Sequence, residues 1–187
     1  MKNPTFSGVS LSVAGALLLA GCSTMMAENP TVGGAAMYAT SDIIENAMNS
    51  ADHTTLVAAV QAAGLADTLK GAGPFTVFAP TNSAFAKLPA GTVETLLKPE
   101  NKATLTGILT YHVVPGRITA ENIAGMAMMN DGKAVLTTVQ GETLTAWSDQ
   151  AGAWYLTDAK GGTSRITIAN VMQSNGVIHV VDTVLMP

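Results

Sequence analysis

Two hydrophobic periods follow one another along the chain. Apolar side chains recur at helical spacing over residues 43–48 and 54–63, and each segment follows Ser, Thr or Asp residues of the kind that cap helices. Residues 75–78 instead alternate in the manner of a strand, which Pro80 ends because proline has no backbone donor. The cap-forming residues 81–83 come next, so the pattern predicts a helix directly after this strand.

The second half of the domain consists mostly of strand-like segments. Short helices are still expected over 93–97 and 100–109, and a brief one is expected after Thr119, which can cap it. The remaining segments are separated largely by glycines and predict strands over 111–114, 134–139, 143–147, 153–156, 165–171 and 177–185. Leading helices followed by successive strands predict an α+β domain, in which helices mostly from the N-terminal half cover the face of a β-sandwich of about seven strands.

The first 21 residues have the pattern of an export signal. A single lysine precedes the uncharged stretch 9–20, which is too short to span a bilayer comfortably. Residues 19–22, Leu-Ala-Gly-Cys, resemble the bacterial lipobox, in which the cysteine thiol is acylated and the chain is cut before it. Cleavage without lipid fits less well, because Met25 stands where an A-x-A-like site needs a small residue. We therefore predict a lipoprotein signal peptide over 1–21 and lipidation of Cys22.

A flexible tether is predicted over residues 22–37, ahead of a domain over residues 38–187. The tether is rich in Ser, Thr, Asn, Pro and Gly and has no apolar period. Two or more acyl chains hold a protein stably on a bilayer, so the lipid bilayer is one expected partner of the acylated N-terminus. We expect an exported, membrane-anchored envelope protein, at the outer membrane and facing the periplasm if the cell is Gram-negative, with release outside the cell as the alternative.

Composition narrows the classes of function. Charged residues make up 12% of the chain and its net charge is −4, which argues against a nucleic-acid partner because the sequence has no basic patch. Cys22 is the one cysteine, which excludes an internal disulfide. His53, His112 and His179 are scattered without the paired spacing of metal ligands, and no serine lies in a nucleophile elbow. We therefore predict no catalytic residue, no metal site and no cofactor. The thioethers within 126–129 offer one alternative, a Cu(I) site, but such methionines more often serve as apolar filling.

Three segments resemble the signatures of the fasciclin domain. They are residues 76–85 (TVFAPTNSAF), 109–116 (LTYHVVPG) and 174–187 (SNGVIHVVDTVLMP), in the family's order and separations, and the likeness runs from Ser41 to the last residue. The resemblance implies a wedge-shaped β-sandwich with helices packed beside it, as in single-domain bacterial surface proteins. It also marks ten motif positions, for which a structural role is our interpretation: Thr76, Phe78, Pro80, Thr81, Asn82, Phe85, Asn175, Gly176, His179 and Asp182.

Tyr111 and His112, in the central segment, are the candidate partner-binding residues. The resemblance connects this pair with receptor binding in animal adhesion proteins. A histidine at the junction of a helix and a strand, next to two valines, is however more often a satisfied core group than an exposed contact. Both interpretations follow from the same residues, and the core interpretation is favoured.

Asp182 is the one acidic residue within the apolar segment 177–185. An unpaired carboxylate in such a strand is unfavourable, so Asp182 is expected to accept hydrogen bonds from a fixed group. Our hypothesis is that this group is the Thr81-Asn82 turn.

Export, tether and resemblance together favour adhesion, with a surface or matrix protein or glycan as the partner. The alternative is a small-ligand or carbohydrate-binding module without catalysis. It would use a groove between the helices and the sheet, with Trp147, Trp154 or Tyr155 as stacking platforms. The same three aromatic residues could equally pack in the core or on an edge strand.

Overall fold

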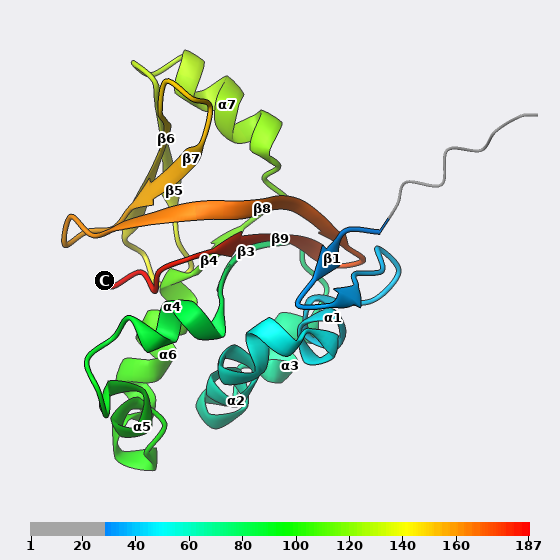
Figure 1. The fold of residues 1–187 in the computed structure, drawn as a ribbon, viewed down its shortest axis with the longest axis vertical. Coiled ribbons are helices and arrows are strands. Elements are labelled where there is room, and N and C mark those ends of the chain that lie inside the picture. Colours follow the sequence, from blue (N-terminus) through cyan, green and yellow to red (C-terminus); the bar gives the residue numbers. More distant parts are fainter. Residues whose placement is uncertain (1–28) are drawn as a thin grey trace, which may run out of the picture.

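The computed structural model describes residues 29–187 (Figure 1). The predicted signal peptide, Cys22 and residues 22–28 of the predicted tether lie outside the described residues. Within the described range, a layer of helices packs on a bent seven-stranded sheet, which confirms the predicted α+β class.

Capping explains several helix boundaries. Glu45 N donates to Asp42 Oδ1 at 2.8 Å and Asp42 N donates back to the Glu45 carboxylate at 3.2 Å, so a capping box begins the first helix. Gly64 ends the second with a left-handed φ of 73°, which glycine adopts without strain. The helices are α1 (Ile43–Asn49), α2 (Thr54–Ala63), α3 (Ala66–Lys70), α4 (Asn82–Ala86), α5 (Thr92–Leu96), α6 (Lys102–Tyr111) and α7 (Ala120–Met128), with 3-10 turns η1 (Ala51–His53) and η2 (Pro99–Asn101).

Seven strands form one sheet in the order β4-β3-β9-β8-β7-β6-β5. They are β3 (Phe75–Pro80), β4 (Val113–Pro115), β5 (Lys133–Thr137), β6 (Thr143–Ser148), β7 (Trp154–Thr157), β8 (Thr163–Gln173) and β9 (Gly176–Val181). β3 and β9 run parallel, and the other neighbouring pairs are antiparallel.

The long strand β8 joins the two halves of this sheet. Its first residues pair with β7 and the rest pair with β9, and the register shifts after Ile166 and again after Ile168. Such irregularities bend a strand, and here they turn the sheet from one layer into the other. Val139 N donates to Val113 O at 2.7 Å, so the chain beyond β5 returns beside β4 and nearly closes the sheet.

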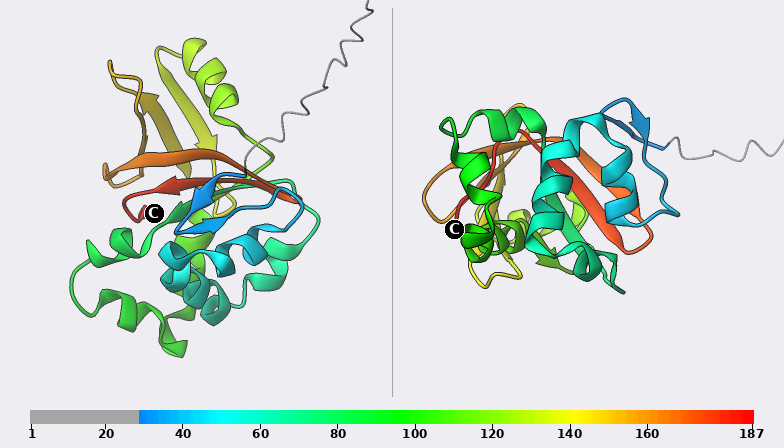
Figure 2. Two further views of the ribbon diagram at one scale, coloured as in Figure 1. Left: turned by 45° about the vertical axis from the view of Figure 1, so that its right-hand side comes forward. Right: turned by 90° about the horizontal axis from the view of Figure 1, so that it is seen from below.

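Two hydrophobic cores lie on opposite sides of β3. Val77 and Ala79 belong to the core beneath the helices, whereas Phe78 between them belongs to the core inside the bent sheet. α7 completes the inner core with Ile123 and Ala127. Figure 2 shows the helices from α1 to α6 on one side of the central strands and α7, in yellow-green, on the other. Burial on both faces explains why these central strands have nearly continuous apolar sequences.

The structure places residues 31–37 in the folded domain rather than in the predicted tether. β1 (Thr31–Val32) and β2 (Ala35–Ala36) form an antiparallel hairpin, and Val32 and Met37 are 3% and 2% exposed in the helix-side core. Ala51 N donates to Gly33 O at 3.3 Å and ties the hairpin to η1. A two-residue strand is too short to show a period, so the sequence of this hairpin resembles that of a glycine-rich spacer.

The limits of several predicted strands differ in the structure, and two of these strands contain motif residues. Tyr111 is the last residue of α6 and His112 is its C-cap, so β4 begins at Val113 rather than at residue 111. β9 ends at Val181, and the segment predicted to continue the strand to residue 185 leaves the sheet. From residue 183 on, backbone N–H groups of this segment donate to side chains rather than to a neighbouring strand, as the contacts of His112 described below illustrate.

Candidate functional site

His112 is enclosed where α6 meets β4 and is 2% exposed. Its Nδ1 lies 2.8 Å from Ile108 O, and Leu185 N donates to its Nε2 at 3.0 Å. Since a backbone N–H can only donate, Nε2 accepts and Nδ1 carries the proton of a neutral ring. Burial lowers the pKa of His112 to about 4, which keeps the ring uncharged at neutral pH. His112 therefore fastens the C-terminal segment to α6.

Tyr111 has an equally internal role. Its side chain is fully buried, and its hydroxyl donates to Thr143 O at 3.0 Å and accepts from Ala159 N at 2.9 Å. Burial raises the pKa of the phenol, so it stays protonated and can make both bonds. Tyr111 and His112 thus hold α6 against the sheet, and neither side chain reaches the surface where a partner could touch it.

Thr81 and Asn82 bond to the ends of different helices. Thr81 Oγ1 accepts from Ala84 N at 3.3 Å and begins α4. Asn82 instead joins two distant helices: its Oδ1 accepts from Thr55 N at 3.0 Å in the first turn of α2, and its Nδ2 donates to Ala51 O at 2.8 Å. Both residues therefore satisfy helix ends that would otherwise lack partners.

Asp182 does not meet the Thr81-Asn82 turn, and that hypothesis is wrong. Its Oδ1 accepts from Arg165 N at 2.9 Å and from the Thr183 hydroxyl at 3.0 Å, and its Oδ2 lies 3.3 Å from Lys87 Nζ. Burial opposes the charge, but these hydrogen bonds and Lys87 outweigh it and lower the pKa of Asp182. The expectation of a fixed partner holds, and that partner is β8, because Asp182 lies just beyond β9 rather than within it.

The remaining polar motif residues also bond inside the domain. Thr76 Oγ1 donates to Gly116 O at 2.6 Å and accepts from Ile118 N at 2.8 Å. Asn175 Oδ1 accepts from Ile43 N at 3.1 Å, and its Nδ2 donates to Leu69 O at 2.7 Å, so this amide serves the start of α1 and the end of α3.

His179 and the apolar motif residues fill the interior. His179 Nε2 lies 2.9 Å from Ile118 O, and its ring stacks on Phe78 with centroids 5.5 Å apart. Burial lowers the pKa of His179. Phe78, Pro80 and Phe85 are buried. Gly176 has no room for a side chain, because a Cβ there would lie 2.1 Å from Phe75 O.

His53 is the third buried histidine. Its Nδ1 lies 2.9 Å from Ser50 Oγ, and its Nε2 has no hydrogen-bond partner among the described residues. Burial lowers the pKa of His53 as well. The three histidines lie in separate places, and residues 29–187 contain no group of three or more His, Cys, Asp or Glu side chains that could hold a metal ion.

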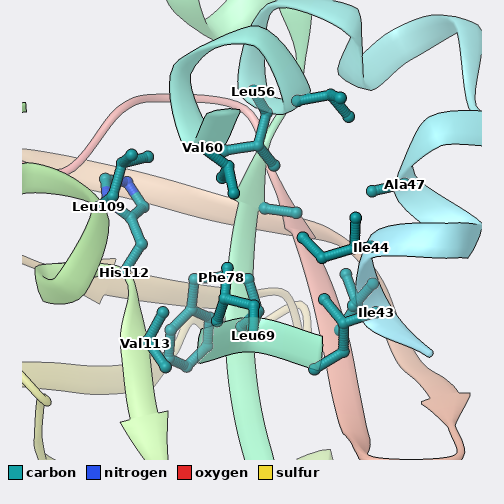
Figure 3. A pocket seen from close by; sticks show the side chains of 14 residues that line it. Ile43, Ile44, Ala47, Leu56, Val60, Leu69, Phe78, Leu109, His112 and Val113 are labelled. Carbon is teal, nitrogen blue, oxygen red and sulfur yellow. The ribbon is translucent and has the colours of Figure 1, made fainter. Parts of the chain in front are cut away.

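An apolar cavity of about 30 Å³ lies between the helices and the sheet. Figure 3 shows residues that line it: Leu56 and Val60 come from α2, Ile44 comes from α1, and Leu109 and His112 come from the C-terminal end of α6. Both His112 nitrogens already have partners, so the cavity has no free polar side chain to orient a ligand. A space of this size matches one or two water molecules, and apolar cavities of this kind remain dry. It is a gap in the packing rather than a carbohydrate groove.

The three candidate aromatic residues lie elsewhere, on β6 and β7. Trp154 packs against the inner core. Trp147 and Tyr155 are half-buried and stack on each other, with centroids 4.8 Å apart and ring planes at 20°. The expected combination of a helix–sheet groove with aromatic platforms is therefore not formed, and the aromatic pair belongs to the sheet surface instead.

The methionines of 126–129 point in different directions. Met126 packs against the inner core, whereas Met128 and Met129 are 86% and 83% exposed. The structure therefore does not gather three thioethers into one site.

Asp158, which holds two segments together, was not among the residues predicted from the sequence. Its carboxylate accepts from Gly162 N at 2.6 Å, Lys160 N at 3.0 Å and Met186 N at 3.0 Å. The tight turn Asp158 to Gly162 was a visible signal for the first two bonds, but the bond to the C-terminal segment needs the tertiary fold.

In the part of the chain that the structure describes, no helix is long and apolar enough to cross a bilayer.

Known proteins resemble this chain over most of its length. The fasciclin domain family matches residues 51–187. Protein sll1483 of Synechocystis sp. is 47% identical over 162 residues, which cover 86% of this chain and 81% of that protein. The cell surface glycolipoprotein MPB83 of Mycobacterium bovis is 34% identical over 190 aligned residues, which cover 98% of this chain and 78% of that protein.

A solved structure shares the fold. The FAS1 domain pair of the insect cell adhesion molecule fasciclin I matches with a TM-score of 0.69 and 17% identity, covering 79% of this chain and 51% of that chain. The present chain thus spans about half of that structure. With the three signatures folded into one interior network and the family matched over residues 51–187, this protein belongs to the fasciclin domain family.

Proposed function

We propose that this protein is a non-catalytic binding module of the cell envelope that supports adhesion to a surface or matrix partner. The fasciclin domain is an adhesion-type, non-catalytic domain. Fasciclin I is named a cell adhesion molecule and MPB83 a cell surface glycoprotein carrying lipid, and these relatives support export and surface exposure for the present chain.

One observation carries the proposal: the polar residues of the three signatures are occupied inside the domain. Thr76, Asn82, His112, Asn175 and His179 each bond to backbone atoms of another segment. Such residues build a rigid scaffold and leave no acid, base or nucleophile poised at a cleft, which an enzyme would need. We therefore assign binding to groups on the surface of this scaffold.

The location follows from the N-terminus. We propose that Cys22 is acylated and that this lipid anchors the exported domain to a membrane of the cell envelope. Mass spectrometry of the mature protein should find a diacyl or triacyl group on Cys22 as the first residue. An unmodified Cys22, or a chain that still begins at Met1, would contradict the anchoring.

Attachment assays test the adhesive role. A strain without this protein, the same strain complemented with the full gene, and the parent should be compared on glass, on a polysaccharide layer and on neighbouring cells. We expect weaker attachment on at least one surface and recovery upon complementation. Equal attachment of all three strains on every surface would refute the proposed function.

A further inference from the structure

A row of four side chains crosses the outer face of strands β5 to β8. The register pairs Lys133 with Trp147, Trp147 with Tyr155, and Tyr155 with Arg165. Directly paired residues of neighbouring antiparallel strands lie on the same face. The row therefore reads cation, aromatic, aromatic, cation, and Lys133 and Arg165 at its ends are exposed.

The face around this row is open to solvent. Alternate residues such as Ala134, Leu144 and Leu156 point inward and are at most 1% exposed, and α7 packs on that inner side. The outward positions beside the row carry one exposed valine, Val135, and a set of threonines: Thr137, Thr143, Thr145, Thr157 and Thr163. Figure 1 shows β5, β6 and β7 at the end of the molecule opposite α5.

The charge of this face differs from that of the whole protein. The chain has a net charge of −4, yet within residues 133–167, all of which the structure describes, the outward positions of β5 to β8 carry two cations and no Asp or Glu. Asp149 lies at the rim, beyond β6, where its carboxylate accepts from Ala151 N, Ala153 N and the Tyr155 hydroxyl. The bond from Ala153 N and, to a lesser extent, Arg165 lower the pKa of Asp149, which keeps its negative charge, so the two cations of the row stand against one rim carboxylate. The strand face itself is therefore complementary to a negatively charged ligand.

The aromatic pair is fixed in place by the sheet. Trp147 Nε1 donates to Thr157 Oγ1 at 3.0 Å, and the Tyr155 hydroxyl lies 3.2 Å from Asp149 Oδ2. The stacked rings thus stand in one orientation before any ligand arrives, which reduces the entropy lost on binding. Three strand spacings of about 4.8 Å put the two cations roughly 14 Å apart, so an extended ligand is needed to reach both.

We propose that the outer face of β5 to β8 binds an acidic polysaccharide, and this inference rests on the proposed binding function. Lys133 and Arg165 pair with carboxylate or sulfate groups along the polymer, the threonine hydroxyls bond to sugar hydroxyls, and the exposed part of the Trp147–Tyr155 pair contacts sugar C–H groups. A bilayer surface fits this face less well, because it offers one exposed aliphatic side chain among threonines.

The experiment measures binding of the purified mature protein to two acidic polymers: alginate, which carries carboxylates, and heparin, which carries sulfates. Neutral dextran serves as the uncharged control, and vesicles of anionic phospholipid test the bilayer alternative. Titration calorimetry at low and physiological salt gives the affinities. We expect binding to alginate, heparin or both, weakened by salt, and none to dextran. The two acidic polymers distinguish the anionic group that is recognised.

A charge-matched pair of variants locates the site. K133A/R165A should weaken binding about tenfold, because it removes two exposed ion pairs. K98A/K102A removes the same charge from exposed lysines near α5 and α6 and should stay within about twofold of the unchanged protein. Equal losses in both variants, or vesicle binding without binding to either acidic polymer, would overturn the inference.

The outcomes separate this inference from the proposed function. Attachment that depends on the protein, combined with no affinity for alginate or heparin, would overturn the acidic-polysaccharide surface and leave the adhesive role standing. Affinity that is lost in K133A/R165A, in a protein whose deletion leaves attachment unchanged, would support the surface and contradict the adhesive role.

Discussion

Acidification should destabilise this domain through His112. The pKa of its buried ring is about 4 in the folded protein, against 6.5 for an exposed histidine. As the pH falls, the unfolded chain therefore takes up the proton first. The stabilisation is complete above the unfolded value of 6.5 and is lost as the pH falls toward 4.

The size of this effect follows from the difference between the two pKa values. A difference of 2.5 units between 6.5 and 4 corresponds to about 3.4 kcal/mol in full. Between about pH 7.5 and about pH 4.5, a range that is accessible to experiment, the free energy of unfolding should fall by about 2.5 kcal/mol. Burial lowers the pKa of His179 and His53 too, so both add to the loss in the same direction.

Urea unfolding of the unchanged protein and of His112→Gln at both pH values isolates the contribution of His112. Glutamine cannot titrate, so the variant should be less stable at neutral pH, by about 1–3 kcal/mol for the backbone donor of Leu185, but should lose about 2.5 kcal/mol less upon acidification. An identical pH dependence in both proteins would refute the reasoning, because it would show that the ring is already protonated or exposed.

Three further substitutions test the interior. Gly176→Ala should cost at least about 3 kcal/mol or prevent folding, because its Cβ would lie 2.1 Å from Phe75 O. Gly107→Ala, which has open space around it in α6, should stabilise the domain by up to about 1 kcal/mol. Thermal unfolding that ranks the two variants in the opposite order would contradict the packing. Val60→Ile should fill the 30 Å³ cavity and add about 0.7 kcal/mol in urea unfolding, and a loss would show that the space is not available. Tyr111→Phe removes two hydrogen bonds and should cost about 1–2 kcal/mol, so unchanged stability would contradict its structural role.

Local signals in the sequence predicted most elements, because caps and periods are short-range features. Thr81 begins α4 and Gly64 ends α2 as the residue types indicate. The partner of Asp182 could not be found in this way. Its bond to Arg165 N depends on how β8 and β9 are aligned after two register shifts, and register across distant strands is not encoded in either segment alone.

The candidate binding surface could not be predicted from the sequence for the same reason, because it depends on the register of distant strands. Trp147 and Tyr155 could be named as exposed or buried candidates, but Lys133 and Arg165 had no distinguishing local pattern. Only the pairing of four strands brings these residues into one row. The hairpin at 31–36 escaped for a different reason, since its two-residue strands are stabilised by tertiary contacts of Val32 rather than by a period of their own.

The division between an internal scaffold and an external contact surface can be tested in one attachment measurement. Beads carrying equal amounts of folded protein are scored on a layer of alginate or heparin, with the unchanged protein, His112→Gln and K133A/R165A compared at neutral pH. We predict that His112→Gln beads attach as the unchanged protein does and that K133A/R165A beads do not. Attachment lost in folded His112→Gln and retained in K133A/R165A would contradict it.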